Sequence, residues 1–88
     1  MDNVSTREKE LVAVFVLAKW GLKEVHYRIG TMNQADMLLD LNAIRQILKI
    51  NDHASTVVLD EHRDIVKKYK DKTLYQMRNI ITEHNSEY

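Results

Sequence analysis

The chain has 88 residues, a length that makes one small domain around a single core. Hydrophobic residues make up 44% of it and charged residues 30%, which is ordinary globular usage and excludes wholesale disorder. Thirteen basic residues balance thirteen acidic ones, so the chain lacks the global basic excess of a general nucleic-acid binder. We therefore expect one domain over residues 1–88, with a frayed tail at 85–88.

Residues that favour tight turns are scarce. Two glycines and no proline leave little material for the turns that many short strands require. The fold class expected is therefore all-α, a compact single domain of four to six short helices with room for a helix-turn-helix-like element.

The absence of cysteine excludes thiol nucleophiles, disulfides and cysteine-ligated zinc. The longest apolar run, residues 11–18, is far shorter than the ~20 residues that span a bilayer. We expect a cytoplasmic protein that makes no membrane contact.

A clear start signal precedes the apolar run. Ser5 and Glu8 have the spacing of a capping box, in which the serine hydroxyl accepts from the Glu8 amide and the glutamate reaches back to the serine amide. Gly21 supplies a stop. The alternating valines inside the run would also suit a buried strand, but the cap, the length and the glycine favour a helix.

The middle of the chain predicts short helices. Apolar residues within 22–29 recur at helical spacing, and Gly30 closes that segment. An apolar stripe over residues 34–50 predicts one bent helix or two short ones, with Asp40 as a candidate cap of the second. Residues 51–55 read as a loop.

Two more helices are expected toward the end. One begins near Ser55 or Asp60 and has His62 on its apolar face. Residues 56–59 could also form a short strand, but we expect none because it would have no partner strand. A break at residues 70–72 follows, and the cap of the last helix is Asp71 or Thr73. That helix is lined by Leu74, Met77, Ile81 and His84.

Motifs of known chemistry are missing. The histidines at 26, 53, 62 and 84 lack the i, i+4 spacing of helical metal ligands, and the charged cluster at 60–64 spreads over different sides of a helix. The chain has no nucleophile elbow and no phosphate-binding glycine loop. We expect no catalytic residue, no metal and no cofactor, and a protein that is not an enzyme.

Two features invite a nucleic-acid interpretation. One is a basic run with Tyr69 and Tyr75 nearby, for which the alternative is a solvated helix end whose lysines complement the helix dipole. The other is the segment 22–39, which resembles a helix-turn-helix but has His26 where a small residue is usual and Asp36 where an apolar one is. The candidate basic patch consists of Arg63, Lys67, Lys68, Lys70 and Lys72.

The apolar first helix is the strongest positive feature. Residues 11–20 supply more apolar surface than one side of a small domain can bury, which favours self-association or a protein partner anchored by Phe15 and Trp20. The alternative is that this helix is the central one, surrounded by the others. The interface predicted on this apolar stretch consists of Leu11, Val14, Phe15, Leu17, Ala18 and Trp20.

Three stretches carry a resemblance to a known family. They are ELVAV at 10–14 with the lysine and tryptophan at 19–20, LNAIRQIL at 41–48, and DIVKKY at 64–69 with MRNI at 77–80. In these the chain resembles the AsiA family of phage anti-sigma proteins, although its segment between Gly21 and Leu41 is shorter. The resemblance implies a helical protein of the host cytoplasm that self-associates through its first helix and gives that face up to the promoter-recognition end of the host's primary sigma factor. By position, it adds Glu10 to the predicted interface and places Leu11, Val14, Leu17 and Trp20 on the same face.

The expected function is regulation by protein–protein contact, as an anti-sigma-like inhibitor or co-regulator of host RNA polymerase. The mechanism would be competitive, with a helix face covering a partner surface. The main alternative is a helix-turn-helix DNA-binding repressor, and a third is a structural assembly subunit.

Overall fold

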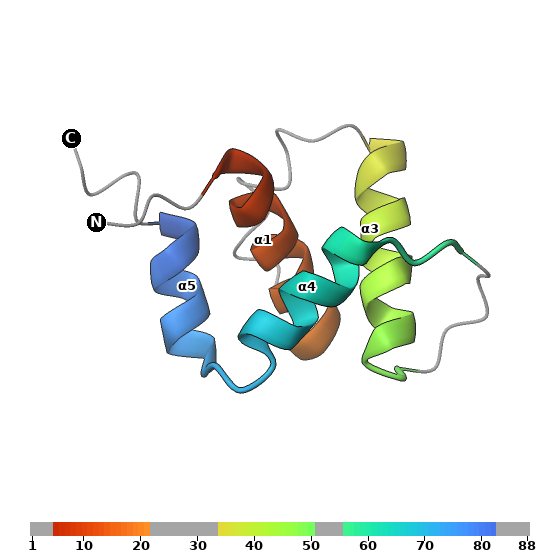
Figure 1. Ribbon diagram of the computed structural model, residues 1–88. Coiled ribbons are helices and arrows are strands. Elements are labelled where there is room, and N and C mark those ends of the chain that lie inside the picture. Colours follow the sequence, from red (N-terminus) through yellow and green to blue (C-terminus); the bar gives the residue numbers. More distant parts are fainter. Residues whose placement is uncertain (1–4, 22–33, 51–55, 83–88) are drawn as a thin grey trace.

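The computed structural model describes residues 5–21, 34–50 and 56–82, and these form four helices and no strand (Figure 1). The all-α prediction is confirmed. Several expected features lie outside the described residues. They are the helix at 22–29, most of the helix-turn-helix-like element, the loop at 51–55, the tail, and the histidines His26, His53 and His84. The helices are α1 (Thr6–Trp20), α3 (Gln34–Ile47), α4 (Asp60–Tyr69) and α5 (Leu74–Thr82).

The ends of α1 follow the local signals in the sequence. The Ser5 hydroxyl accepts from the Glu8 amide at 3.0 Å. Gly21 has a left-handed φ of +67° and donates its N–H to the Leu17 carbonyl at 2.8 Å. The other half of the expected capping box is wrong, because the Glu8 carboxylate accepts from Lys68 and Tyr69 of α4. The Glu8 side chain therefore makes tertiary contacts with α4 instead of a local capping bond.

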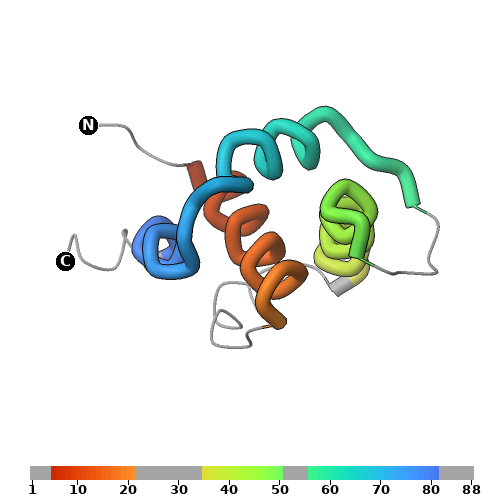
Figure 2. The backbone as a smooth tube through the Cα atoms, turned by 90° about the horizontal axis from the view of Figure 1, so that it is seen from below, coloured from red at the N-terminus to blue at the C-terminus, as the bar shows by residue number. Residues whose placement is uncertain are grey.

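The first helix is the central one. Figure 2 shows α1 between α3 and α5, with α4 crossing over it, and α1 packs against all three. Every side chain from residue 11 to residue 16 is no more than 2% exposed. The expectation that α1 leaves an apolar side uncovered is therefore wrong for this monomer. A helix that is apolar all round is stable when other helices surround it.

One continuous helix, α3, spans the segment for which one or two helices were expected. Asp40 lies in its middle and is 4% exposed, so it is not a cap. The helix ends in a Schellman motif: the Ile50 N–H bonds to the Arg45 carbonyl at 3.0 Å and the Lys49 N–H to the Gln46 carbonyl at 3.1 Å. Lys49 takes the left-handed position of that motif, with φ +61°.

The last two helices confirm the expected pattern. In α4 the side chains at 62, 65, 66 and 69 are buried, as the apolar face required. The chain breaks at 70–72, and Thr73 caps α5, its hydroxyl accepting from the Gln76 amide at 3.1 Å while the Gln76 side chain accepts from the Thr73 amide at 2.9 Å. Met77 and Ile81 are fully buried.

Among the described helices, none has both the length and the apolar character needed to cross a membrane.

Candidate functional site

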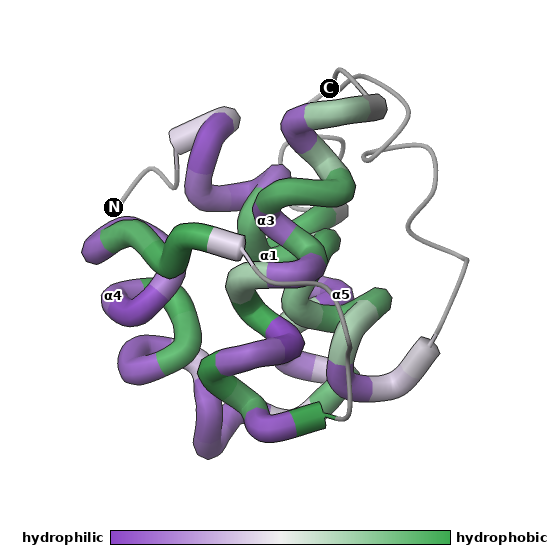
Figure 3. Tube along the Cα trace, turned by 90° about the vertical axis from the view of Figure 1, so that its right-hand side faces the viewer, coloured by the Kyte–Doolittle hydropathy of each residue, from purple (hydrophilic) through white to green (hydrophobic). Residues whose placement is uncertain are grey.

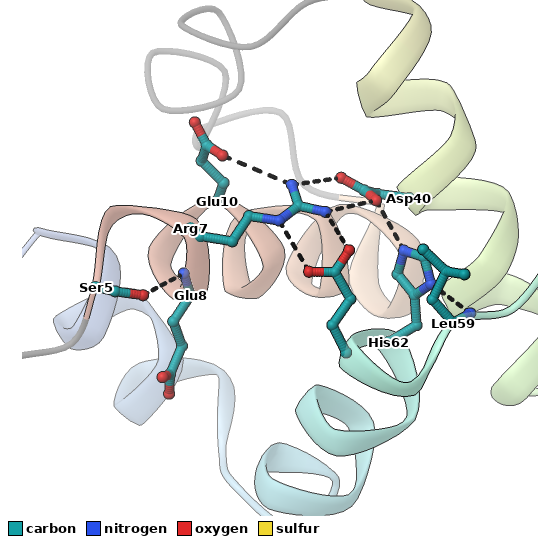
Figure 4. A network of polar contacts seen from close by, with 8 residues as sticks. Ser5, Arg7, Glu8, Glu10, Asp40, Leu59 and His62 are labelled. Carbon is teal, nitrogen blue, oxygen red and sulfur yellow. Dashed lines mark hydrogen bonds and ion pairs between the residues drawn. The ribbon is translucent and has the colours of Figure 1, made fainter.

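A charged network joins α1, α3 and α4 near the start of α1 (Figure 4). Arg7 makes two hydrogen bonds to Asp40 of α3, from Nη1 to Oδ2 at 2.9 Å and from Nη2 to Oδ1 at 3.0 Å. It makes two more to Glu61 of α4, from Nε to Oε1 at 3.2 Å and from Nη2 to Oε2 at 2.9 Å. One guanidinium thus holds two carboxylates, each in a bidentate pair, which is the strong geometry for arginine.

His62 completes the network on its buried side. Its side chain is 3% exposed, and that of Asp40 is 6% exposed. The Leu59 backbone N–H donates to Nδ1 at 3.0 Å, and Nε2 lies 2.7 Å from Asp40 Oδ1. Because Nδ1 accepts, the proton of the neutral ring is on Nε2 and is donated to Asp40. His62 therefore both closes the first turn of α4 and fixes the Asp40 carboxylate.

The pKa shifts in the network follow from these contacts. The hydrogen bonds that Arg7 donates to Glu61 and Asp40 raise the pKa of Arg7 above its already high value. The hydrogen bond from Arg7 lowers the pKa of Glu61, against the opposing effect of partial burial. The arginine and Glu61 are charged throughout the physiological range.

An open hollow of about 590 Å³ lies directly over the network, between α3 and the segment that leads into α4. Three of the side chains lining it are large, apolar and exposed: Leu39 at 56%, Val57 at 74% and Leu59 at 49%. Figure 3 shows the apolar stretch that precedes α4, beside α3. The hollow is lined by three carboxylates and one arginine, and we call it the acidic hollow. We define it by Asp36, Leu39, Asp40, Val57, Leu59 and Glu61, with Arg7 and His62.

The network does not fit a metal ion. Ligand atoms of Asp40, Glu61 and His62 lie within 4.8 Å of one another. However, the Arg7 guanidinium already occupies the position between the two carboxylates, and both ring nitrogens of His62 are engaged. The same engagement leaves Nδ1 no free lone pair for general base catalysis. The arrangement can hold three helices together and present charge at the floor of the hollow.

The predicted partner interface is largely inside the protein. Leu11, Val14, Phe15 and Ala18 belong to the core, and Leu17 and Trp20 pack against it, partly buried. Glu10 lies beside the network, with Oε1 3.7 Å from Arg7 Nη1. Binding of a partner through these residues stays a prediction, and it would require α1 to leave its neighbours.

The predicted basic patch is split by the structure. Arg63, Lys67 and Lys70 lie on the side of α4 that faces the end of α3. Lys68 lies elsewhere, with Nζ 2.7 Å from Glu8 Oε2. Tyr69, one of the two tyrosines that invited the nucleic-acid interpretation, is 2% exposed and cannot stack on a base. Tyr75 is 73% exposed on α5.

Sequence reasoning missed the network, although two signals for it were present. Asp40 falls beside the apolar stripe of α3, and His62 falls on the apolar face of α4. Two polar residues on faces that must be buried require polar partners. The position of Arg7 gave no such signal, because a charged residue in a first helical turn is ordinary.

Comparison of the chain with protein-family models, with curated proteins and with solved structures finds no match.

Proposed function

We propose that the protein is a small regulator that acts by protein–protein contact, and that the acidic hollow is its contact surface. The observation that carries the proposal is the clustering of Leu39, Val57 and Leu59, all about half exposed or more, around one hollow. In a small domain exposed apolar groups at one place are an unused source of binding energy, about 1.5–3 kcal/mol for each large side chain fully covered.

The charge of the hollow selects the chemistry of the partner. Asp36, Asp40 and Glu61 line it together with one cation, Arg7, which is bound to Asp40 and Glu61. An acidic surface with an apolar rim complements a segment that carries basic and apolar side chains together. Basic residues are what a DNA-reading segment needs to approach phosphates.

The resemblance to the AsiA family supplies a partner of that chemistry, the promoter-recognition end of a bacterial primary sigma factor. A regulator that covers this basic surface would compete with promoter DNA for it. The proposal differs from the family expectation in the surface used, since the residues of α1 are occupied in the core and the hollow is open.

The experiment is a calorimetric titration of the protein with the isolated promoter-recognition domain of a bacterial primary sigma factor. Val57→Lys places a cation on the apolar rim, and we expect it to weaken binding at least about tenfold. Tyr75→Lys is the matched control, because Tyr75 is 73% exposed where Val57 is 74% exposed, and it lies on α5 away from the hollow.

Three results would overturn the proposal: no complex with the sigma domain, equal binding by Val57→Lys and the wild-type protein, or equal losses from both variants. Retardation of duplex DNA that weakens steeply with salt, without binding to the sigma domain, would favour the DNA-binding alternative instead.

A further inference from the structure

A second groove lies between the end of α3 and the outer side of α4, and its volume is about 780 Å³. It differs from the acidic hollow in charge. We call it the basic groove, defined by an apolar floor of Ile47, Leu48 and Val66 and by a rim of exposed cations, Lys49, Arg63, Lys67 and Lys70.

The rim on α4 is aligned by helical geometry. Arg63, Lys67 and Lys70 stand at i, i+4 and i+7, so they share one face of the helix and its C-terminal end. Within the described ranges, no carboxylate lies within ion-pair distance of Lys67 or Lys70. Arg63 has only the exposed Asp60, at 3.4 Å. The groove therefore presents positive charge that the described part of the protein leaves largely uncompensated.

Lys49 provides a second and independent observation. Its φ of +61° is the left-handed conformation that favours glycine, because a Cβ there meets the following carbonyl. A lysine at this helix end holds the backbone in an unfavourable conformation that glycine would adopt freely. Its side chain lines the basic groove. Because this strained conformation places the Lys49 cation in the basic groove, it indicates that the cation has a binding role.

We propose that the basic groove docks an acidic amphipathic helix of a protein partner. Acidic side chains of such a helix would pair with the rim, and its apolar side chains would cover Ile47, Leu48 and Val66. A nucleic-acid backbone would pair with the rim but leave the apolar floor uncovered, and the buried Tyr69 offers no ring for base stacking. This inference is independent of the proposed function, because it uses another groove and a partner of opposite charge.

The probe is a fluorescein-labelled peptide of about 18 residues, a length of some five helical turns, with leucines at i, i+3, i+4 and i+7 and glutamates between them. Binding is followed by fluorescence anisotropy at low salt. A scrambled peptide of the same composition loses the apolar face and keeps the charge. We expect the designed peptide to bind with a Kd of about 10 μM and the scrambled one at least about tenfold more weakly.

Variants of the rim locate the binding. Lys67→Glu with Lys70→Glu should weaken binding of the designed peptide by about tenfold or more. Lys72→Glu is the matched control, because Lys72 is an exposed lysine of the same basic run that does not line the groove, and we expect no change.

Two substitutions at Lys49 separate a binding role from a structural one. Lys49→Gly and Lys49→Ala both remove the ammonium group, and both should weaken binding by about threefold. Only glycine relieves the left-handed backbone, so Lys49→Gly should raise the Tm by about 3 °C and Lys49→Ala should not.

The proposal is overturned if the designed peptide does not bind, if the scrambled peptide binds equally well, or if binding is insensitive to Lys49 and to the Lys67 and Lys70 reversal. It is also overturned if duplex or single-stranded DNA binds with that same sensitivity while the peptide does not.

Discussion

Arg7 and Glu8 are neighbours in the first turn of α1, yet they connect to opposite ends of α4. Arg7 reaches the first turn of α4 at Glu61 and continues to Asp40 of α3. Glu8 reaches the last turn, where it accepts from Lys68 at 2.7 Å and from the Tyr69 hydroxyl. Together the two side chains fasten α4 along α1, and Figure 4 draws the contacts that Arg7 makes.

The two contacts differ in what surrounds them. The Asp40 side chain is 6% exposed, whereas that of Lys68, the charged partner of Glu8, is 60% exposed. A carboxylate that loses its partner in the interior cannot recover the lost interaction from water, while a surface ammonium can. We therefore expect Arg7 to contribute more to stability than Glu8, because one of the charges that Arg7 pairs with is buried.

The largest effect is expected from Arg7→Met, which keeps the length of the side chain and removes the guanidinium. Asp40 would be left with His62 as its donor in the network, and we expect a loss of about 2–3 kcal/mol in the free energy of unfolding, below the range for fully buried pairs because Arg7 is partly exposed. Urea denaturation followed by circular dichroism measures it.

A second substitution tests the physical reason. Adding Asp40→Asn removes the stranded charge while leaving an oxygen that accepts from His62. The double variant should be more stable than Arg7→Met alone by about 1 kcal/mol. Simple additivity of the two single losses would show that the Asp40 charge is not what makes Arg7 important.

A smaller effect is expected from Glu8→Gln, which keeps the shape and removes the charge that pairs with Lys68. We expect a loss of about 1 kcal/mol, because the contact is partly exposed to water. The same denaturation experiment measures it, with Ser5 retained so that the cap of α1 is unchanged. A loss as large as that of Arg7→Met would remove the distinction between the two contacts.

The smallest expected effect is the change in stability with pH that arises from the ionisation of Glu8 and Glu61. Partial burial opposes ionisation of Glu8, but hydrogen bonds from Lys68 and Tyr69 outweigh it, so the pKa of Glu8 is lowered from 4.5, as is that of Glu61. Their contribution is present above pH 4.5 and is lost as the pH falls through the lower, folded-state values.

Tyr69 acts at the other end of the pH scale. Burial, with the Glu8 hydrogen bond, raises the pKa of Tyr69 above 10.0. Its contribution is therefore present below pH 10 and is lost as the pH rises further. Urea midpoints measured from pH 3 to 11 should show a plateau between about pH 5 and 9, and Glu8→Gln should reduce the decline at both ends.

Local signals in the sequence predicted the ends of the helices well. The Ser5 cap, the Gly21 stop and the Thr73 cap act through hydrogen bonds between residues three or four positions apart, so they can be identified without the fold. The buried faces of α4 and α5 followed from their spacing. The Arg7 contacts could not be found this way, since they join residues 33 and 54 positions apart.

The sequence by itself determined that residues 6–20 form an apolar helix within an all-α domain, because hydrophobic spacing and caps act over a few residues. Only the tertiary structure decided that this helix is enclosed, that Asp40 and Glu61 share one arginine, and that α3 and α4 enclose grooves of opposite charge. Burial and pairing depend on which distant segments meet, and an apolar helix has the same sequence pattern whether its own domain or another protein covers it.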